Sequence, residues 1–162
     1  MTAVSFTVNG LAAPAGSKKG FYNAKAKRVI ITDASTRSRP WKAQVSDAAT
    51  EAMDGRDLLV GPLLLEVTFW VPRPQGHYGS GRNAGTVRAS APWAPIVKPD
   101  LLKLARAVED AMSSIVYRDD AQVTSEVLQK AYTTGQARTE IRVVQVQPPV
   151  RIEDHATDAV SL

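Results

Sequence analysis

The chain of 162 residues contains no cysteine, only two histidines and no long run of apolar residues. The absence of cysteine excludes disulfide bonds, thiolate nucleophiles and zinc–thiolate sites. A membrane-spanning helix needs about 20 consecutive apolar residues, which this sequence lacks. The first ten residues, MTAVSFTVNG, lack the charged and apolar regions of a signal peptide. We therefore expect a cytoplasmic protein with no membrane partner.

Sequence motifs that bind nucleotides or mark common hydrolases are also missing. GxGxxG, the P-loop pattern, HExxH and GxSxG do not occur. This argues against a nucleotide cofactor, a metalloprotease and a serine hydrolase.

Acidic residues are scarce in the first part of the chain. Residues 1–98 carry 13 lysines and arginines against 6 acidic residues, whereas residues 99–162 carry 7 against 10. The formal charge of +4 thus combines a basic part with an acidic part. This asymmetry is typical of a protein that grips a polyanion beside a carboxylate site. The alternative is a basic surface that is merely solvated.

Hydrophobic periodicity predicts one domain over residues 1–146 and a flexible tail over residues 147–162. Alternating apolar residues predict strands at 4–8, 29–31, 63–71, 122–131 and 138–146. Helical spacing predicts helices at 38–53 and from residue 101 to the serines at 113–114. The glycine- and proline-containing segments after residue 10 and over residues 72–99 are expected to be loops, and the second is a candidate substrate-contacting flap.

Two segments concentrate the positive charge. Between Gly10 and Lys42, Asp33 is the single acidic residue among eight lysines and arginines, and three aromatic residues are interleaved with them. Residues 72–99 contain no acidic residue at all. Basic residues interleaved with aromatic ones suit a phosphate backbone with occasional base contacts. The alternative for the first segment is a hairpin with inward-packed aromatic residues and solvated lysines.

Carboxylates flank the second predicted helix. Asp100 precedes it, and Asp119 and Asp120 precede the next strand. A helix of 12 residues separates its ends by about 18 Å, and the sequence does not decide whether the return brings these carboxylates together. Together, they would suit Mg²⁺ and metal-assisted phosphodiester hydrolysis. Otherwise Asp100 is only a helix cap and the Asp119–Asp120 pair only a solvated turn.

The motifs of this region resemble the RusA family of Holliday-junction endodeoxyribonucleases of bacteria and phages. They are KPD at 98–100, RAVEDAM at 106–112 and VYRDDAQV at 116–123. PAGSKK at 14–19 and FWVPRP at 69–74 extend the resemblance over residues 3–146. The resemblance implies a single α/β (α+β) domain with a mixed β-sheet and two main helices. It also implies a homodimer that resolves four-way DNA junctions by paired symmetric nicks.

The resemblance also implies roles for individual residues. Asp100 and Asp120, together with Asp119 next to Asp120, would hold Mg²⁺, and Mn²⁺ could replace it. Lys103 or Arg106 would stabilise charge on the scissile phosphate. The residues expected to contact the arms of branched DNA are Lys18, Lys19, Arg73, His77, Arg82, Arg88 and Lys98.

One position departs from the family pattern. Leu102 stands where the family carries its second catalytic aspartate, and Lys103 where it carries an asparagine. Glu109 or Asp119 is a candidate to replace the missing carboxylate. The departure leaves a second hypothesis open, that of a weakened or inactive protein that binds branched DNA. An unrelated basic interaction protein is the third.

Overall fold

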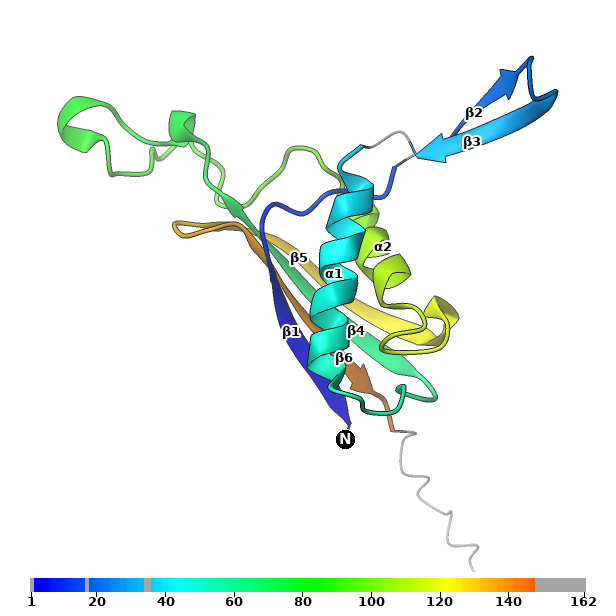
Figure 1. Cartoon of the computed structure of the whole chain (residues 1–162). Helices are drawn as coiled ribbons and strands as arrows, with labels where there is room; N and C mark the ends of the chain where they lie inside the picture. Colours follow the sequence, from blue (N-terminus) through cyan, green and yellow to red (C-terminus); the bar gives the residue numbers. More distant parts are fainter. Residues whose placement is uncertain (1, 17, 34–35, 148–162) are drawn as a thin grey trace, which may run out of the picture.

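The computed structural model describes residues 2–16, 18–33 and 36–147, which fold as one α+β domain. Two helices cover one face of a four-stranded sheet, and a separate hairpin projects from the body (Figure 1). The helices are α1 (Ser38–Met53) and α2 (Leu101–Met112). The strands of the sheet are β1 (Ala3–Asn9), β4 (Leu63–Pro72), β5 (Val123–Thr133) and β6 (Arg138–Gln145). The sequence-based prediction of a mixed sheet with two main helices is confirmed.

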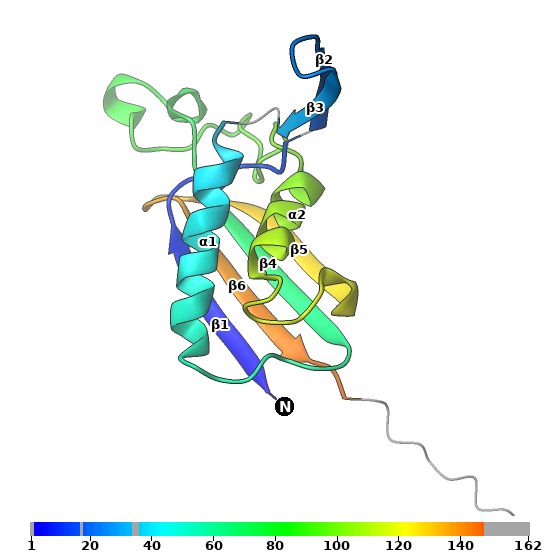
Figure 2. The ribbon, with the colours of Figure 1, turned by 45° about the vertical axis from the view of Figure 1, so that its right-hand side comes forward.

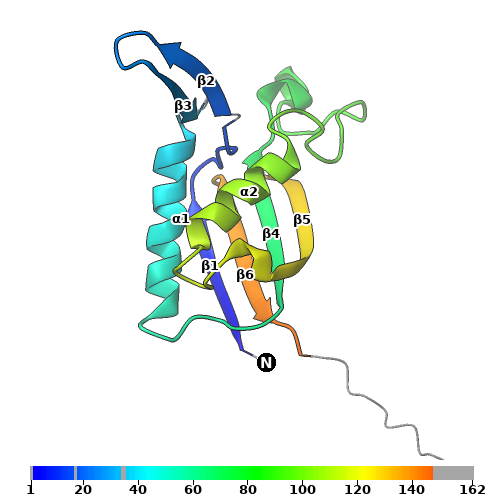
Figure 3. The same ribbon diagram turned by 90° about the vertical axis from the view of Figure 1, so that its right-hand side faces the viewer.

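The sheet has the order β1-β6-β4-β5, and only β4 and β5 are parallel. Their register pairs Leu63 with Val123 and Phe69 with Lys130. Parallel neighbours need a crossover that carries the chain back along the sheet, and α2 is that crossover. Figure 3 shows α2 running toward the end of the sheet where β5 begins. The two ends of α2 therefore lie near opposite ends of β5.

The core lies between the helices and one face of the sheet. Alternate residues of β4 from Leu63 to Phe69 are buried, as a two-residue period requires. In α2, the predicted apolar face is buried: Leu104, Ala105, Ala107, Val108, Ala111 and Met112. Trp41, Val45, Ala49 and Met53 of α1 complete the core. Each helix therefore buries one apolar stripe against the sheet.

The segment after β1 differs from its prediction as a loop with one short strand. The structure has a two-stranded hairpin, β2 (Lys18–Asn23) and β3 (Arg28–Asp33), paired in register. The Asn23 side chain accepts a hydrogen bond from the Ala26 amide, and Lys27 adopts a positive φ, which closes the turn. The Tyr22 side chain is 66% exposed, so it does not pack inward as the alternative supposed.

Residues 73–99 also differ from the predicted structureless loop. Two 3₁₀ turns, η1 (Gln75–His77) and η2 (Gly81–Asn83), and a bridge between Tyr78 and Val87 order them. Figure 2 shows that this loop and the β2–β3 hairpin project from the same end of the domain. We call them the loop arm (residues 73–92) and the hairpin arm (residues 18–33).

Two further predictions concern membranes and the tail. Within the described residues, no helix is long and apolar enough to cross a membrane. The predicted tail over residues 147–162 lies, apart from Gln147, outside the residues that the structure describes.

Candidate active site

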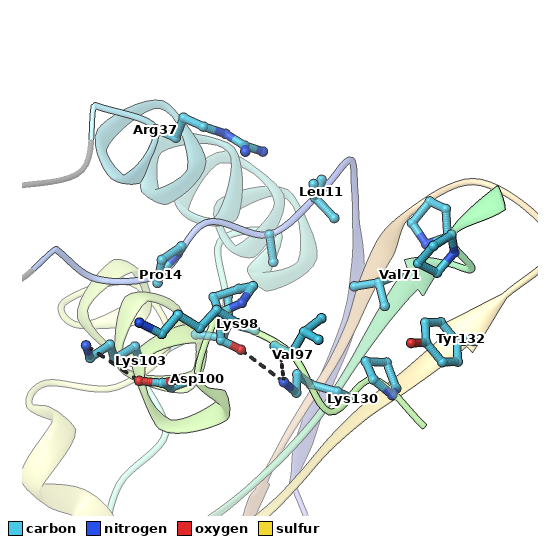
Figure 4. Close-up of a pocket in the computed structure, with 16 residues that line it drawn as sticks. Leu11, Pro14, Arg37, Val71, Val97, Lys98, Asp100, Lys103, Lys130 and Tyr132 are labelled. Carbon is cyan, nitrogen blue, oxygen red and sulfur yellow. Dashed lines mark hydrogen bonds and ion pairs between the residues drawn. The ribbon is translucent and has the colours of Figure 1, made fainter. Parts of the chain in front are cut away.

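A cleft of about 570 Å³ opens at the start of α2, and Figure 4 shows the residues that line it. The KPD motif forms one of its walls. Four of its lining residues are basic, namely Arg37, Lys98, Lys103 and Lys130, and the acidic one is Asp100. Prolines and apolar side chains such as Leu11, Val71 and Val97 make up much of the remaining surface. We call this the basic cleft. Its positive charges favour an anionic ligand.

Asp100 is the N-cap residue of α2, but its side chain makes no capping hydrogen bond. Its carboxylate faces the Lys103 ammonium instead, with Oδ2 and Nζ 3.6 Å apart. Both side chains are about half exposed, so this ion pair contributes little to stability. The alternative that Asp100 serves only as a helix cap does not match this geometry. Its carboxylate remains accessible in the cleft.

Lys130 reaches the cleft from β5, and the sequence reasoning missed it. Its ammonium donates hydrogen bonds to the carbonyl oxygens of Val97, at 2.9 Å, and Pro99, at 3.0 Å. Arg37, just before α1, was noted only as part of a basic segment. Neither residue lies in a recognisable motif. The long-range packing of β5 and α1 against the KPD turn brings them into the cleft.

Asp119 and Asp120 lie in a different setting, at the short 3₁₀ helix η3 (Asp120–Gln122). The Asp119 carboxylate accepts a hydrogen bond from the Ala121 amide at 2.8 Å and forms a capping box with Gln122. The Gln122 side-chain oxygen accepts from the amides of Arg118 and Asp119. Its side-chain nitrogen donates to carbonyl oxygens in the segment before β4, those of Leu59 and Gly61. Asp119 thus has a structural role, and Asp120 is exposed.

Asp120 belongs to a cluster of acidic side chains with Glu109, Asp110 and Glu126. Partial burial, and next the charge of Glu126, raise the pKa of Glu109 to about 7. Asp120 and Asp110 add to this shift, and so does a hydrogen bond between the side chains of Glu109 and Glu126. We call these four residues the acidic cluster. A proton on Glu109 relieves the repulsion among these carboxylates.

The basic cleft and the acidic cluster lie apart. Lys130, beside Asp100, is seven residues along β5 from Val123, which spans about 23 Å in a parallel strand. Asp120 lies before Val123, at the far end. Among the described residues of one chain, no three His, Asp or Glu side chains are close enough together to hold a metal ion. Within one chain, the structure does not bring Asp100 and Asp120 together, and the Mg²⁺ site stays a prediction.

The other residues predicted at the catalytic centre are exposed. Arg106 lies on the surface of α2 and is not part of the cleft lining. Leu102 is 70% exposed, so it is no core leucine. The role of Arg106 in catalysis stays a prediction, and Leu102 remains the position that departs from the family pattern.

The predicted DNA contacts fall into three groups. Arg82 and Arg88 are exposed on the loop arm, and Lys98 is exposed in the basic cleft. Arg73 and His77 both pack against the Tyr132 ring, at centroid distances of 4.1 Å for the guanidinium carbon and 5.6 Å for the imidazole ring. The structure places the backbone of Lys18 and Lys19 in β2, whereas their side chains lie outside the described part.

Comparisons with known proteins agree with the sequence motifs. The model of a protein family described as endodeoxyribonuclease RusA matches residues 12–144. The chain is also 25% identical over 146 residues to the uncharacterized protein YqaN of Bacillus subtilis (strain 168). That match covers 90% of this chain and 99% of the relative. The region matched by the family model includes the acidic cluster and the basic cleft apart from Leu11.

Proposed function

Because the chain belongs to the endodeoxyribonuclease RusA family, we propose that it is a Mg²⁺-dependent nuclease that resolves four-way DNA junctions. The observation that carries the proposal is the accessible Asp100 carboxylate within a cleft lined by four basic side chains. Lysines and arginines attract the phosphate backbone. A carboxylate beside a phosphate suffers like-charge repulsion, which a hard divalent cation relieves by binding both. Asp100 has the chemistry of such a ligand.

The two arms support branched DNA as the substrate. They project from the end of the domain that holds the basic cleft (Figure 2). The hairpin arm carries Lys25, Lys27 and Arg28 exposed near its turn, and the loop arm carries Arg82 and Arg88. No acidic residue occurs from residue 67 to residue 99. Each arm offers positive charge to a separate stretch of phosphate backbone, as a junction with several duplex arms requires.

The separation of Asp100 from Asp120 supports a homodimer. Within one chain these carboxylates lie at opposite ends of β5 and α2. If both bind one metal ion, a second copy of the chain must bring its own Asp120 to the basic cleft. A two-fold dimer built in this way has two equivalent sites, which match the two-fold symmetry of a four-way junction.

The test is cleavage of a labelled four-way junction in Mg²⁺, beside a linear duplex of the same sequence. We expect paired nicks in the junction, an intact duplex, and no nicks without divalent cation or with Asp100→Asn or Asp120→Asn. A mixture of these two variants, refolded together, decides whether the site is shared. In a mixed dimer with shared sites, one site carries both substitutions and the other is intact, so single unpaired nicks appear. Sites confined to one chain give no nicks in the mixture, and an uncut junction with the natural chain overturns the nuclease proposal.

Leu102 favours a second candidate function, a protein of the same family that binds junctions without cutting them. Leu102 follows Asp100 by two residues, and its side chain is 70% exposed. An aspartate at this position would therefore be accessible as well. The test compares the natural chain with Leu102→Asp, and with Leu102→Asn as a polar control without charge. Cutting by Leu102→Asp alone, with equal junction binding by all three, supports the binding protein. Cutting by the natural chain overturns it.

A further inference from the structure

We infer that Lys130 is a positioning residue for Asp100, which it serves by holding the KPD turn against the sheet. This inference rests on the proposed nuclease function. Lys130 lies on β5, ten residues after Asp120, and no sequence motif used above includes it. Its ammonium bonds to two backbone carbonyls and to neither oxygen of the Asp100 side chain, so it acts on Asp100 through the backbone.

The geometry of the two hydrogen bonds defines this role. Lys130 Nζ lies 2.9 Å from the Val97 carbonyl oxygen and 3.0 Å from that of Pro99, the residue directly before Asp100 (Figure 4). Hydrogen bonds from an ammonium are roughly twice as strong as those between neutral groups. Pro99 has no amide hydrogen of its own, which reduces the donors available to fix this turn from within. Two carbonyls that converge on one cation therefore fix the orientation of the backbone that enters α2.

Strand β5 also holds the beginning of the segment that leads to Asp100, residues 92–100. Arg73 stacks on the Tyr132 ring of β5 and donates a hydrogen bond of 2.9 Å to the Pro92 carbonyl oxygen. Residues 92–100 are thus attached to β5 near one end through Tyr132 and near the other through Lys130. Because β5 is paired along its length with β4, it is a rigid support. A site held by a rigid strand keeps its carboxylate in place more accurately than one held by a loop alone.

The experiment compares the natural chain with Lys130→Met, which keeps the length of the side chain but removes the ammonium, and with Lys130→Arg, which keeps donors. Arg142→Gln is the control for loss of one positive charge, because Arg142 pairs with Glu66 away from the basic cleft. Junction binding is measured with Ca²⁺ in place of Mg²⁺, and cutting in a single turnover. Hydrogen exchange of residues 93–104 reports on the turn without any need for activity.

For Lys130→Met we expect single-turnover cutting to fall about 100-fold, because a small displacement of a reacting group costs a factor of that size. Junction binding should weaken less than 5-fold, and exchange over residues 93–104 should become about 10-fold faster, since lost bonds allow local opening. Lys130→Arg should recover part of the cutting rate. Arg142→Gln should change none of these readouts.

Three results would overturn the inference. One is cutting by Lys130→Met within 3-fold of the natural chain. Another is a loss of binding as large as the loss of cutting, because this marks Lys130 as a phosphate contact. The third is unchanged hydrogen exchange over residues 93–104 in Lys130→Met. This result would show that Lys130 does not hold the turn, even if the natural chain proves not to cut DNA. If Lys130→Met does not fold, Lys130→Gln and Lys130→Arg provide the same comparison.

Discussion

The two ends of the β4–α2–β5 crossover both carry aspartates from the motifs, but in opposite electrostatic settings. At the start of α2, Asp100 lies among basic side chains and remains accessible. At the start of β5, Asp120 lies among other carboxylates, where the pKa of Glu109 rises to about 7. The basic side chains around Asp100 favour an anionic ligand, whereas burial and the carboxylates around Glu109 favour a proton on Glu109. The same residue type therefore has different chemistry at the two ends.

Each aspartate turn is tied to another segment of the chain by one side chain. Lys130 binds two carbonyl oxygens of the turn before Asp100. Gln122 accepts hydrogen bonds from two amides of the turn before Asp120 and donates to the segment before β4. The Gln122 amide fixes its turn within the fold, whereas the Lys130 ammonium also adds positive charge to the basic cleft. This difference predicts that Gln122 matters most for stability and Lys130 for activity.

The largest expected effect is a difference in junction nicking between variants of Asp100 and of Asp119. Asp100→Asn should reduce junction nicking on the order of 1,000-fold, as loss of a charged group at a reacting centre does, while junction binding stays equal or tightens. Asp119→Asn should nick within a few-fold of the natural chain, because asparagine caps a helix as well as aspartate. Single-turnover cleavage in Mg²⁺ measures both. Equal losses in the two variants would show that Asp119 acts in catalysis and not only as a cap.

The next effect concerns stability at the Asp119–Asp120 turn. Gln122→Ala removes hydrogen bonds to two amides and two carbonyl oxygens. Loss of a half-buried group with several partners should lower the free energy of unfolding by about 2–3 kcal/mol. Urea unfolding measures it, with Gln129→Ala on the exposed side of β5 as the matched control. A change below about 0.5 kcal/mol, the usual range for exposed positions, would mean that Gln122 does not hold the turn.

A smaller effect is expected in the salt dependence of DNA binding. Lys98→Gln removes one exposed charge from the basic cleft, so the slope of log K against log salt should decrease by about one for duplex arms. At a single moderate salt concentration, affinity should fall less than about 10-fold. Arg142→Gln, on the far side of the sheet, should leave the slope unchanged. A Lys98→Gln slope equal to that of the natural chain would place the phosphates outside the basic cleft.

The sequence predicted the two helices and the four strands of the main sheet well, because the local hydrophobic period determines them. It left open whether the Asp100 carboxylate is an accessible ligand or only caps α2. It left the spacing of Asp100 and Asp120 open, because that spacing depends on whether β5 pairs parallel or antiparallel to β4. The β2 strand was missed because Gly20 resembles a loop residue. Lys130 was missed because its contacts are 31 and 33 residues away in the sequence.

The smallest expected effect is a pH dependence of folding stability that arises from the acidic cluster. Glu109 has a pKa of about 7 in the folded protein, above its ordinary value of 4.5, so the folded chain holds a proton that the unfolded chain releases. Stability from this proton is therefore complete below pH 4.5 and is lost as the pH rises through 7. The groups that face Glu109 are Glu126, Asp120 and Asp110, and Lys42 pairs with Asp110.

Glu109→Gln should remove this dependence, since an amide cannot titrate and still offers hydrogen bonds to Glu126. Because Glu109 is only partly buried, solvent screening should limit the effect to less than about 1 kcal/mol. The measurement is the difference in melting temperature between the natural chain and Glu109→Gln from pH 5 to pH 8. The natural chain should lose relative stability over this range. Gln129→Ala, measured in the same way, should show a constant difference, because neither side chain titrates. A constant difference for Glu109→Gln as well would mean that the pKa of Glu109 in the folded protein is not raised.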